Sequence, residues 1–227
     1  PKVDSYETDL SFYDKAAESV CNVLANRENK KRVVLVNKST VPIGTAVHLE
    51  EIIRKTNCEN VGAASNPEFL PEGEAVKGSK HPERIAIGAS YQEDFDILDD
   101  VYANFLKSPK TKIIRMSPES AEAVKYVANT RLLTQVSFTN GILVGIGESI
   151  PGVEVEKVRE AVGSDSRIGY WGLYPSNGAG GSCFGKDIKS LITQMAKMGA
   201  SQSNIDLLIN VLNINEHQKT YLLERAD

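Results

Sequence analysis

The residues best suited to chemistry lie in one segment, Gly180-Gly181-Ser182-Cys183-Phe184-Gly185-Lys186-Asp187. Its glycines allow a ligand to approach the backbone closely, and Ser182 can cap the helix expected to follow. Cys183 falls in the first turn of that helix, where the helix dipole and Lys186 both favour a thiolate. Lys186 and Asp187 follow at helical spacing, so thiol, ammonium and carboxylate share one face. The pattern favours covalent catalysis on an electrophilic carbon, with a buried cysteine beside a glycine turn as the alternative.

Two further pairs of residues have a spacing that could serve chemistry. Lys125 and Asn129 are four apart in an expected helix and could stabilise an oxyanion or hold water, although a solvated surface pair has the same spacing. Glu68 and Glu72 follow the end of an expected strand, where open α/β sheets bind ligands. Thr40 also follows a strand, and its hydroxyl could hold water, cap the next helix or do both.

The elements that must position these residues alternate in the first half of the chain. The expected strands are 33–36, 61–64, 84–88 and 112–115, and the expected helices are about 11–26, 45–56 and 92–107. This alternation predicts a mostly parallel, doubly wound sheet. Four strands are few for a complete two-half nucleotide-binding fold. The fold class is therefore α/β, with an incomplete Rossmann-like sheet.

From Ser117 onward no strand pattern returns. A long helix is expected to begin near Pro118 and run toward 145–147, followed by helices at about 153–162, 186–198 and 202–224. We therefore place a boundary near residue 116. Residues 1–116 would form a Rossmann-like α/β part, and residues 117–227 an all-helical part.

Composition narrows the classes of partner. The chain has 227 residues, a net charge of −4 and no basic cluster, so nucleic acid is not expected as a partner. No run of about 18 apolar residues occurs, so no membrane span is predicted. Pro1-Lys2-Val3-Asp4 does not have the pattern of a secretory signal. Three cysteines without metal-like spacing fit a reducing cytoplasm. The three histidines share no spacing with the motifs above, so neither a histidine base nor a metal site is expected.

Four motifs, in order, resemble those of the UDP-glucose 6-dehydrogenase family. They are residues 38–45 (KSTVPIGT), 66–73 (NPEFLPEG), 122–130 (EAVKYVANT), and 163–169 (GSDSRIG) with 173–175 (LYP) and 180–187 (GGSCFGKD). The matches run nearly from end to end. The resemblance implies a four-electron oxidation of a nucleotide sugar from C6 alcohol to carboxylate, with two NAD⁺ reduced in turn, by a homodimer or higher homo-oligomer.

The resemblance also implies roles for individual residues. Cys183 would capture the aldehyde as a thiohemiacetal, and oxidation would give a thioester that water hydrolyses. The implied catalytic residues are Cys183, Lys125, Asn129, Asp187, Thr40 and Glu72. The implied substrate-binding residues are Glu68, Phe69, Leu70, Arg167, Leu173, Tyr174, Ser176 and Gly180. The implied cofactor-binding residues are Ser39, Thr40, Glu72, Cys183 and Lys186.

The chain departs from the family pattern in several places. Gly185 replaces a usual proline, Ala179 replaces a common aromatic residue, and Asn140 is followed by Gly141 where an acidic residue is frequent. No G-x-G-x-x-G follows an N-terminal strand, and the glycine-rich stretch 178–181 lies in the helical half. We therefore expect an internal piece of a longer enzyme, which does not bind NAD on its own.

The identity of the sugar nucleotide stays open at this stage. UDP-glucose is favoured because GSDSRIG and LYP resemble its dehydrogenases more than those for GDP-mannose. The alternatives are the same chemistry on GDP-mannose or on a UDP-N-acetylhexosamine. A catalytically impaired homologue that serves assembly is a further alternative, suggested by Gly185 and Ala179.

Overall fold

The structure is a computed structural model that describes residues 7–107, 109–181 and 183–225. Its contacts divide into two compact units, one of Glu7–Lys125 and one that begins at Tyr126, and helix α5 (Pro118–Phe138) contributes to both. Each unit has a hydrophobic core of its own. Ser182, expected to cap a helix, lies outside the described residues.

The N-terminal unit is built on a four-stranded sheet in the order β1-β2-β3-β4. The strands are β1 (Val33–Asn37), β2 (Val61–Ser65), β3 (Arg84–Ala89) and β4 (Lys112–Met116). β1 pairs with β2, and β3 with β4, in parallel. β2 and β3 are antiparallel and meet only where Ala64 lies opposite Ala89 and Ser65 opposite Gly88. The expected mostly parallel α/β sheet is confirmed, with one antiparallel junction that was not predicted.

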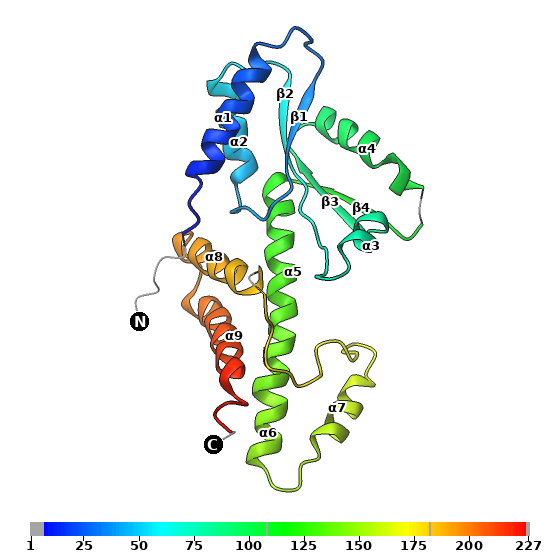
Figure 1. Cartoon of the computed structure of the whole chain (residues 1–227), viewed down its shortest axis with the longest axis vertical. Coiled ribbons are helices and arrows are strands. Elements are labelled where there is room, and N and C mark those ends of the chain that lie inside the picture. Colours follow the sequence, from blue (N-terminus) through cyan, green and yellow to red (C-terminus); the bar gives the residue numbers. More distant parts are fainter. Residues whose placement is uncertain (1–6, 108, 182, 226–227) are drawn as a thin grey trace. The chain divides into compact units, whose positions relative to one another are not determined.

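Helices cover both faces of this sheet (Figure 1). They are α1 (Ser11–Ala25) and α2 (Thr45–Lys55) on one face and α4 (Gln92–Leu106) on the other, whereas the short α3 (Ala75–Lys80) has no buried residue. On the first face, Cys21 of α1 and Leu49 and Ile53 of α2 share one core with Ala63 of β2. On the other face, Leu98 of α4 packs against Ile85 and Ile87 of β3. Both faces of the central strands β2 and β3 are thus largely buried, as parallel sheets favour, whereas the edge strand β4 keeps Ile114 and Arg115 exposed.

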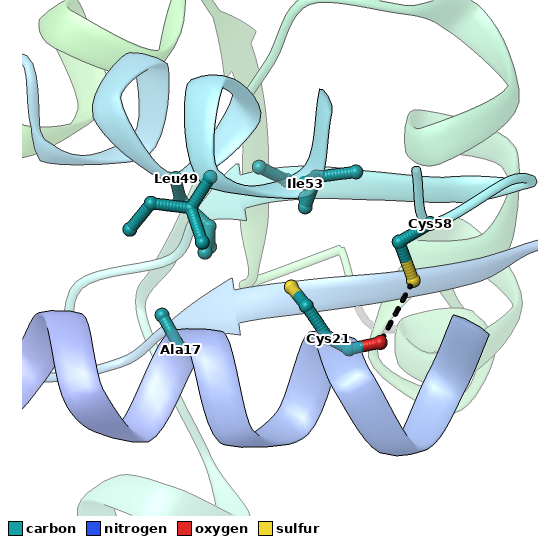
Figure 2. Packing of buried hydrophobic residues seen from close by; sticks show 7 residues of the cluster. Ala17, Cys21, Leu49, Ile53 and Cys58 are labelled. Carbon is teal, nitrogen blue, oxygen red and sulfur yellow. Dashed lines mark hydrogen bonds between the residues drawn. The ribbon is translucent and has the colours of Figure 1, made fainter. Parts of the chain in front are cut away.

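The core beneath α1 and α2 contains both cysteines of this unit (Figure 2). Cys21 is fully buried, and burial raises the pKa of its thiol. Cys58 is buried beside it, and its thiol donates to the Cys21 carbonyl oxygen at 3.4 Å. Both side chains therefore contribute to packing.

In the part of the chain that the structure describes, the C-terminal unit contains helices and loops but no strand. After α5 come a π-helical turn η1 (Thr139–Leu143), α6 (Val144–Ser149), α7 (Val155–Gly163), α8 (Cys183–Lys197) and α9 (Gln202–Thr220). Its core joins Ile188 and Ile192 of α8 to Leu208 and Leu212 of α9. The expected long helix thus continues through a π turn into α6. None of the described helices is long and apolar enough to cross a membrane.

Candidate active site

The loops after β1 and β2 are joined by Asn66, a fully buried residue that directly follows β2. Asn66 Nδ2 donates to a β3 carbonyl at 2.7 Å, and Asn66 Oδ1 accepts from Lys38 Nζ at 2.7 Å and from the Tyr102 hydroxyl. Although Lys38 is exposed as a residue, its ammonium end is partly buried. Burial lowers the pKa of Lys38, and the Glu68 carboxylate opposes that shift. This network fixes two loops that carry predicted site residues.

Phe69 brings two cations together in the N-terminal unit. The Arg84 guanidinium lies 4.3 Å from the Phe69 ring centroid and Lys125 Nζ lies 5.7 Å from it, both within the range of a cation–π interaction. Glu68, Phe69 and Leu70 line a cavity of about 220 Å³. This volume is below the roughly 300 Å³ at which ligand pockets usually begin, so the cavity alone is smaller than a nucleotide sugar needs. Four predicted residues thus lie near one another in this unit.

The other predicted residues of this unit lie in the loops at the strand ends. Ser39 and Thr40 lie between β1 and α2, and Glu72 lies in the turn before α3. Ser39 and Glu72 are exposed and Thr40 is half-buried, so all three side chains are accessible to a ligand.

Glu122 is a buried carboxylate in the first part of α5 that the sequence interpretation did not assign to the site. Its Oε2 accepts from the Gly44 backbone N–H at 2.6 Å, and its Oε1 accepts from the Ala46 N–H and the Ser65 hydroxyl, each at 2.8 Å. Burial raises the pKa of Glu122, and these three hydrogen bonds oppose the shift. Glu122 therefore attaches α5, one turn before Lys125, to the loop that carries Thr40.

These hydrogen bonds also bear on the fit of NAD. A dinucleotide pyrophosphate is commonly bound by free N–H groups at the start of the helix that follows a strand. At the start of α2, the Gly44 and Ala46 N–H groups are already bonded to Glu122. At the start of α2, these two N–H groups are therefore not free to bind a pyrophosphate.

In the C-terminal unit, Asn129 and Asp187 form a buried pair. Asn129 Nδ2 donates to Asp187 Oδ2 at 2.6 Å, and the Asp187 side chain is almost fully buried. Lys186 Nζ lies 3.7 Å from Asp187 Oδ1 and is largely exposed. Cys183 is exposed and begins α8, one helical turn before Asp187. The structure thus brings the expected amide, ammonium and carboxylate together and places the thiol on the same helix.

Gly185, the departure from the family pattern in this turn, is not required by packing. Among the described residues, no atom lies within 4 Å of the position that a Cβ would occupy there, apart from the two chain neighbours and the helix's own backbone. The glycine therefore loosens the first turn of α8 without making room for a neighbour.

Arg167 and Tyr174 are the predicted substrate residues that make pairs of their own. Arg167 is exposed and forms an ion pair with Asp165, with its Nη2 at 2.6 Å from Oδ2. Hydrogen bonding to Asp165 raises the pKa of Arg167. Tyr174 is exposed, and the Arg159 guanidinium lies 4.3 Å from its ring centroid. Both predicted residues are accessible, but each pairs with a side chain that was not predicted.

The remaining predicted residues lie in the loop 172–181, before α8. Leu173 is buried, whereas Ser176 and Gly180 are exposed. The backbone of this loop is bound by three buried amide side chains from η1 and α9: Asn140, Asn215 and Gln218. None of them was predicted as a site residue, and Asn140 was noted only for the glycine that follows it. Their only signal in the sequence is an amide residue that interrupts an apolar helical pattern.

Among the described residues, no group of three or more histidine, cysteine, aspartate or glutamate side chains is placed to hold a metal ion.

The described residues thus define a protein class with a Rossmann-like half-sheet followed by a helical unit, in which a cysteine and a buried aspartate lie on one helix. Family models identify the family. Residues 1–106 match the NAD binding domain, and residues 119–217 the central domain, of the UDP-glucose/GDP-mannose dehydrogenase family. The chain belongs to this family, whose NAD-binding domain matches the cofactor expected from the sequence.

Individual relatives agree. The chain is 40% identical over 200 residues to the UDP-glucose 6-dehydrogenase of Pseudomonas aeruginosa, covering 86% of this chain and 43% of that protein. It is 35% identical over 227 residues to UDP-glucose 6-dehydrogenase TuaD of Bacillus subtilis, covering 99% of this chain and 46% of that protein. A UDP-glucose dehydrogenase structure from Pyrobaculum islandicum superposes with a TM-score of 0.81 at 34% identity, over 94% of this chain and 48% of that one. The chain thus spans under half the length of these curated relatives.

Proposed function

We propose that this chain is part of an NAD-dependent nucleotide-sugar 6-dehydrogenase that oxidises UDP-glucose to UDP-glucuronate. Residues 1–116 would belong to the NAD-binding domain and residues 117–227 to the helical central domain. The observation that carries the proposal is the buried Asn129–Asp187 hydrogen bond, one helical turn from the exposed Cys183. Because the chain spans under half of its relatives, the activity is proposed for the full-length protein that carries it.

The first oxidation removes the hydroxyl proton and one C6 hydrogen of the sugar. Bound NAD⁺ supplies the oxidising power of the reaction, because one NAD⁺ accepts a hydride in each of the two oxidations. In the N-terminal unit, Thr40 and Glu72 hold water, and the Lys125 ammonium stabilises negative charge on the substrate oxygen. In the C-terminal unit, Asp187 accepts a proton through water while Asn129 fixes the orientation of its carboxylate.

The second oxidation passes through Cys183. Its thiolate adds to the aldehyde carbon, which forms a C–S bond and a thiohemiacetal, and loss of the remaining C6 hydrogen as hydride gives a thioester. Water oriented by Asp187 then adds to the thioester carbon, the C–S bond breaks, and carboxylate and thiolate are released. The covalent bond retains the reactive aldehyde between the two oxidations, which explains why a cysteine is used.

The choice of UDP-glucose is supported by similarity. The relatives named UDP-glucose 6-dehydrogenase are 34–40% identical to this chain, whereas a GDP-mannose dehydrogenase structure from Pseudomonas aeruginosa is 26% identical with a TM-score of 0.62. We expect the full-length protein to show a higher kcat/KM for UDP-glucose than for GDP-mannose or UDP-N-acetylglucosamine, followed by NADH absorbance. A higher value for either competitor would contradict this choice.

An inactive homologue is the competing proposal, because Gly185 and Ala179 depart from the family pattern. The Ala179 N–H and carbonyl are both hydrogen-bonded to Asn215, so the loop stays anchored regardless of the side chain at 179. No reduction of NAD⁺ with any of the three sugar nucleotides would favour the inactive homologue.

We also infer a homo-oligomer that buries an apolar stripe of the C-terminal unit. The stripe runs from the end of α5 through η1 into α6 at intervals of four residues and consists of Phe138, Ile142 and Ile146, which are 40–53% exposed. Exposed apolar side chains that share one helix face mark a protein contact. An Ile146→Glu variant should shift the mass measured by light scattering toward the monomer, and an unchanged mass would contradict this interface.

A further inference from the structure

Three buried amide side chains form hydrogen bonds with the backbone of the loop that precedes α8. We call them the amide clamp: Asn140 of η1, and Asn215 and Gln218 of α9. Asn140 Oδ1 accepts from the Ser176 N–H at 2.9 Å, Asn140 Nδ2 donates to Ser176 Oγ at 3.3 Å, and Gln218 Nε2 donates to the Ser176 carbonyl at 2.8 Å. Asn215 Oδ1 accepts from the Ala179 N–H at 2.8 Å, and Asn215 Nδ2 donates to the Ala179 carbonyl at 3.3 Å.

The clamp acts on a loop that is also fixed at both ends by close contacts. Gly172 has φ +76°, its carbonyl accepts from Thr139 Oγ1 at 2.6 Å, and a Cβ there would lie 2.9 Å from Gln135 Cβ. Gly178 has φ +83°, and a Cβ there would lie 3.0 Å from Asn215 Oδ1. Any side chain at 172 or 178 would therefore be strained and crowded. The loop has one backbone conformation that fits against η1 and α9.

If these three side chains served only to fill space, burying their polar amide groups would destabilise the folded protein. Burying a polar group is unfavourable unless it is hydrogen-bonded, and the α8–α9 core beside the clamp is made of leucine, isoleucine and valine. Each clamp residue instead directs its amide to the loop backbone, and Asn140 and Asn215 use both their oxygen and their nitrogen. The bonds hold the peptide groups at 176 and 179 in fixed orientations.

We propose that Asn140, Asn215 and Gln218 are positioning residues that hold the loop 173–179 in the conformation that binds the nucleotide sugar. This inference rests on the proposed function, in which that loop lies against the sugar. The clamp does not contact the substrate itself. Because Ser176 Oγ accepts from Asn140, its hydroxyl hydrogen is directed away from the clamp, which makes Ser176 a hydrogen-bond donor toward a ligand.

The sharpest variant is Asn215→Asp in the full-length protein. An aspartate keeps the shape and still accepts from the Ala179 N–H, but its second oxygen faces the Ala179 carbonyl without a hydrogen to donate. We expect KM for UDP-glucose to rise about tenfold at neutral pH while KM for NAD⁺ stays within about twofold. The deficit relative to wild type should shrink as pH falls, because a protonated carboxyl can donate to that carbonyl again. Asn213→Asp is the matched control, with the same charge change on an exposed position of α9.

Gln218→Met provides a second variant in case Asn215→Asp fails to fold. It removes the donor to the Ser176 carbonyl and keeps the length of the side chain, and Ser176 is exposed enough for water to replace the bond. Hydrogen exchange of a peptide that covers 172–181, without substrate, should speed up in this variant and not in Asn213→Asp.

The possible outcomes separate the clamp from the proposed function. A wild-type protein that binds none of the three sugar nucleotides contradicts the proposed function itself. A wild-type protein that binds UDP-glucose, with clamp variants that fold and keep both its KM and the loop exchange rate, contradicts only the clamp. A proportional rise in KM for UDP-glucose and for NAD⁺ in the variants also contradicts the clamp, because a general loss of structure would raise both KM values.

Discussion

At the scale of single residues, Glu122 illustrates how a site can depend on a group that the sequence presents as ordinary. A glutamate in the first turns of a helix is explained by the helix dipole alone. The structure adds three hydrogen bonds to groups 57 to 78 residues away in sequence. The clamp amides Asn140, Asn215 and Gln218 likewise bind partners 36 to 42 residues away in sequence. Pattern analysis detects spacing within a helix and has no access to such partners.

Glu122 should make stability depend on pH in a defined direction. Its pKa is raised in the folded protein above the ordinary value of 4.5, so the folded state binds its proton more tightly than the unfolded state. This contribution to the free energy of unfolding is therefore complete below pH 4.5 and declines as pH rises through the raised pKa.

Urea denaturation of wild type and Glu122→Gln at several pH values would isolate that contribution as a difference. We expect the wild type to lose stability relative to the variant as pH rises above the ordinary value. At all pH values the glutamine should carry a cost of about 1–3 kcal/mol, because its NH₂ group would face a backbone N–H. A difference that does not change with pH would show that Glu122 has the same pKa folded and unfolded.

At the scale of elements, most strands and helices were predictable because their apolar patterns are regular. The strands expected at 33–36, 61–64, 84–88 and 112–115 correspond to β1 through β4, and the long helix from Pro118 corresponds to α5. The antiparallel junction of β2 and β3 was not predictable from alternation. The connection between them, residues 66–83, is long enough for a parallel crossover, but it contains only the six-residue α3 where such a crossover usually has a longer helix.

A substitution at Gly62 in β2 would test how tightly α4 packs on the sheet. A Cβ at this position would overlap both carboxylate oxygens of Asp94, which is fully buried and paired with Arg32 at 2.6 Å. Gly62→Ala should therefore cost more than about 2 kcal/mol, measured by urea denaturation.

The matched control is Gly145→Ala in α6, where no atom of the described part of the chain, apart from the local helix backbone, lies within 4 Å of the added carbon. It should stabilise the protein by up to about 1 kcal/mol because alanine is the better helix former. Equal effects of the two substitutions would contradict the packing described for Gly62.

At the scale of the whole molecule, membership of the family is indicated by motifs that are spread along nearly the entire chain. The affinity for NAD⁺ depends instead on groups that could bind its pyrophosphate, and these motifs do not contain them. The polar side chains at the strand ends are accessible, but the N–H groups at the start of α2 are bonded to Glu122. The 227-residue chain alone should therefore bind NAD⁺ more weakly than micromolar affinity. Isothermal titration of the chain and of the full-length protein would test this, and micromolar binding by the chain alone would show that it contains a complete cofactor site.

The central claim is that Cys183 carries the sugar from aldehyde to acid. The most direct measurement supplies limiting UDP-glucose with excess NAD⁺ to the full-length protein and counts the NADH formed per sugar nucleotide. We predict two equivalents for the wild type and no more than one for Cys183→Ser, because a serine hydroxyl is a far poorer nucleophile than a thiolate. One equivalent from the wild type, or two from the variant at the wild-type rate, would contradict the account.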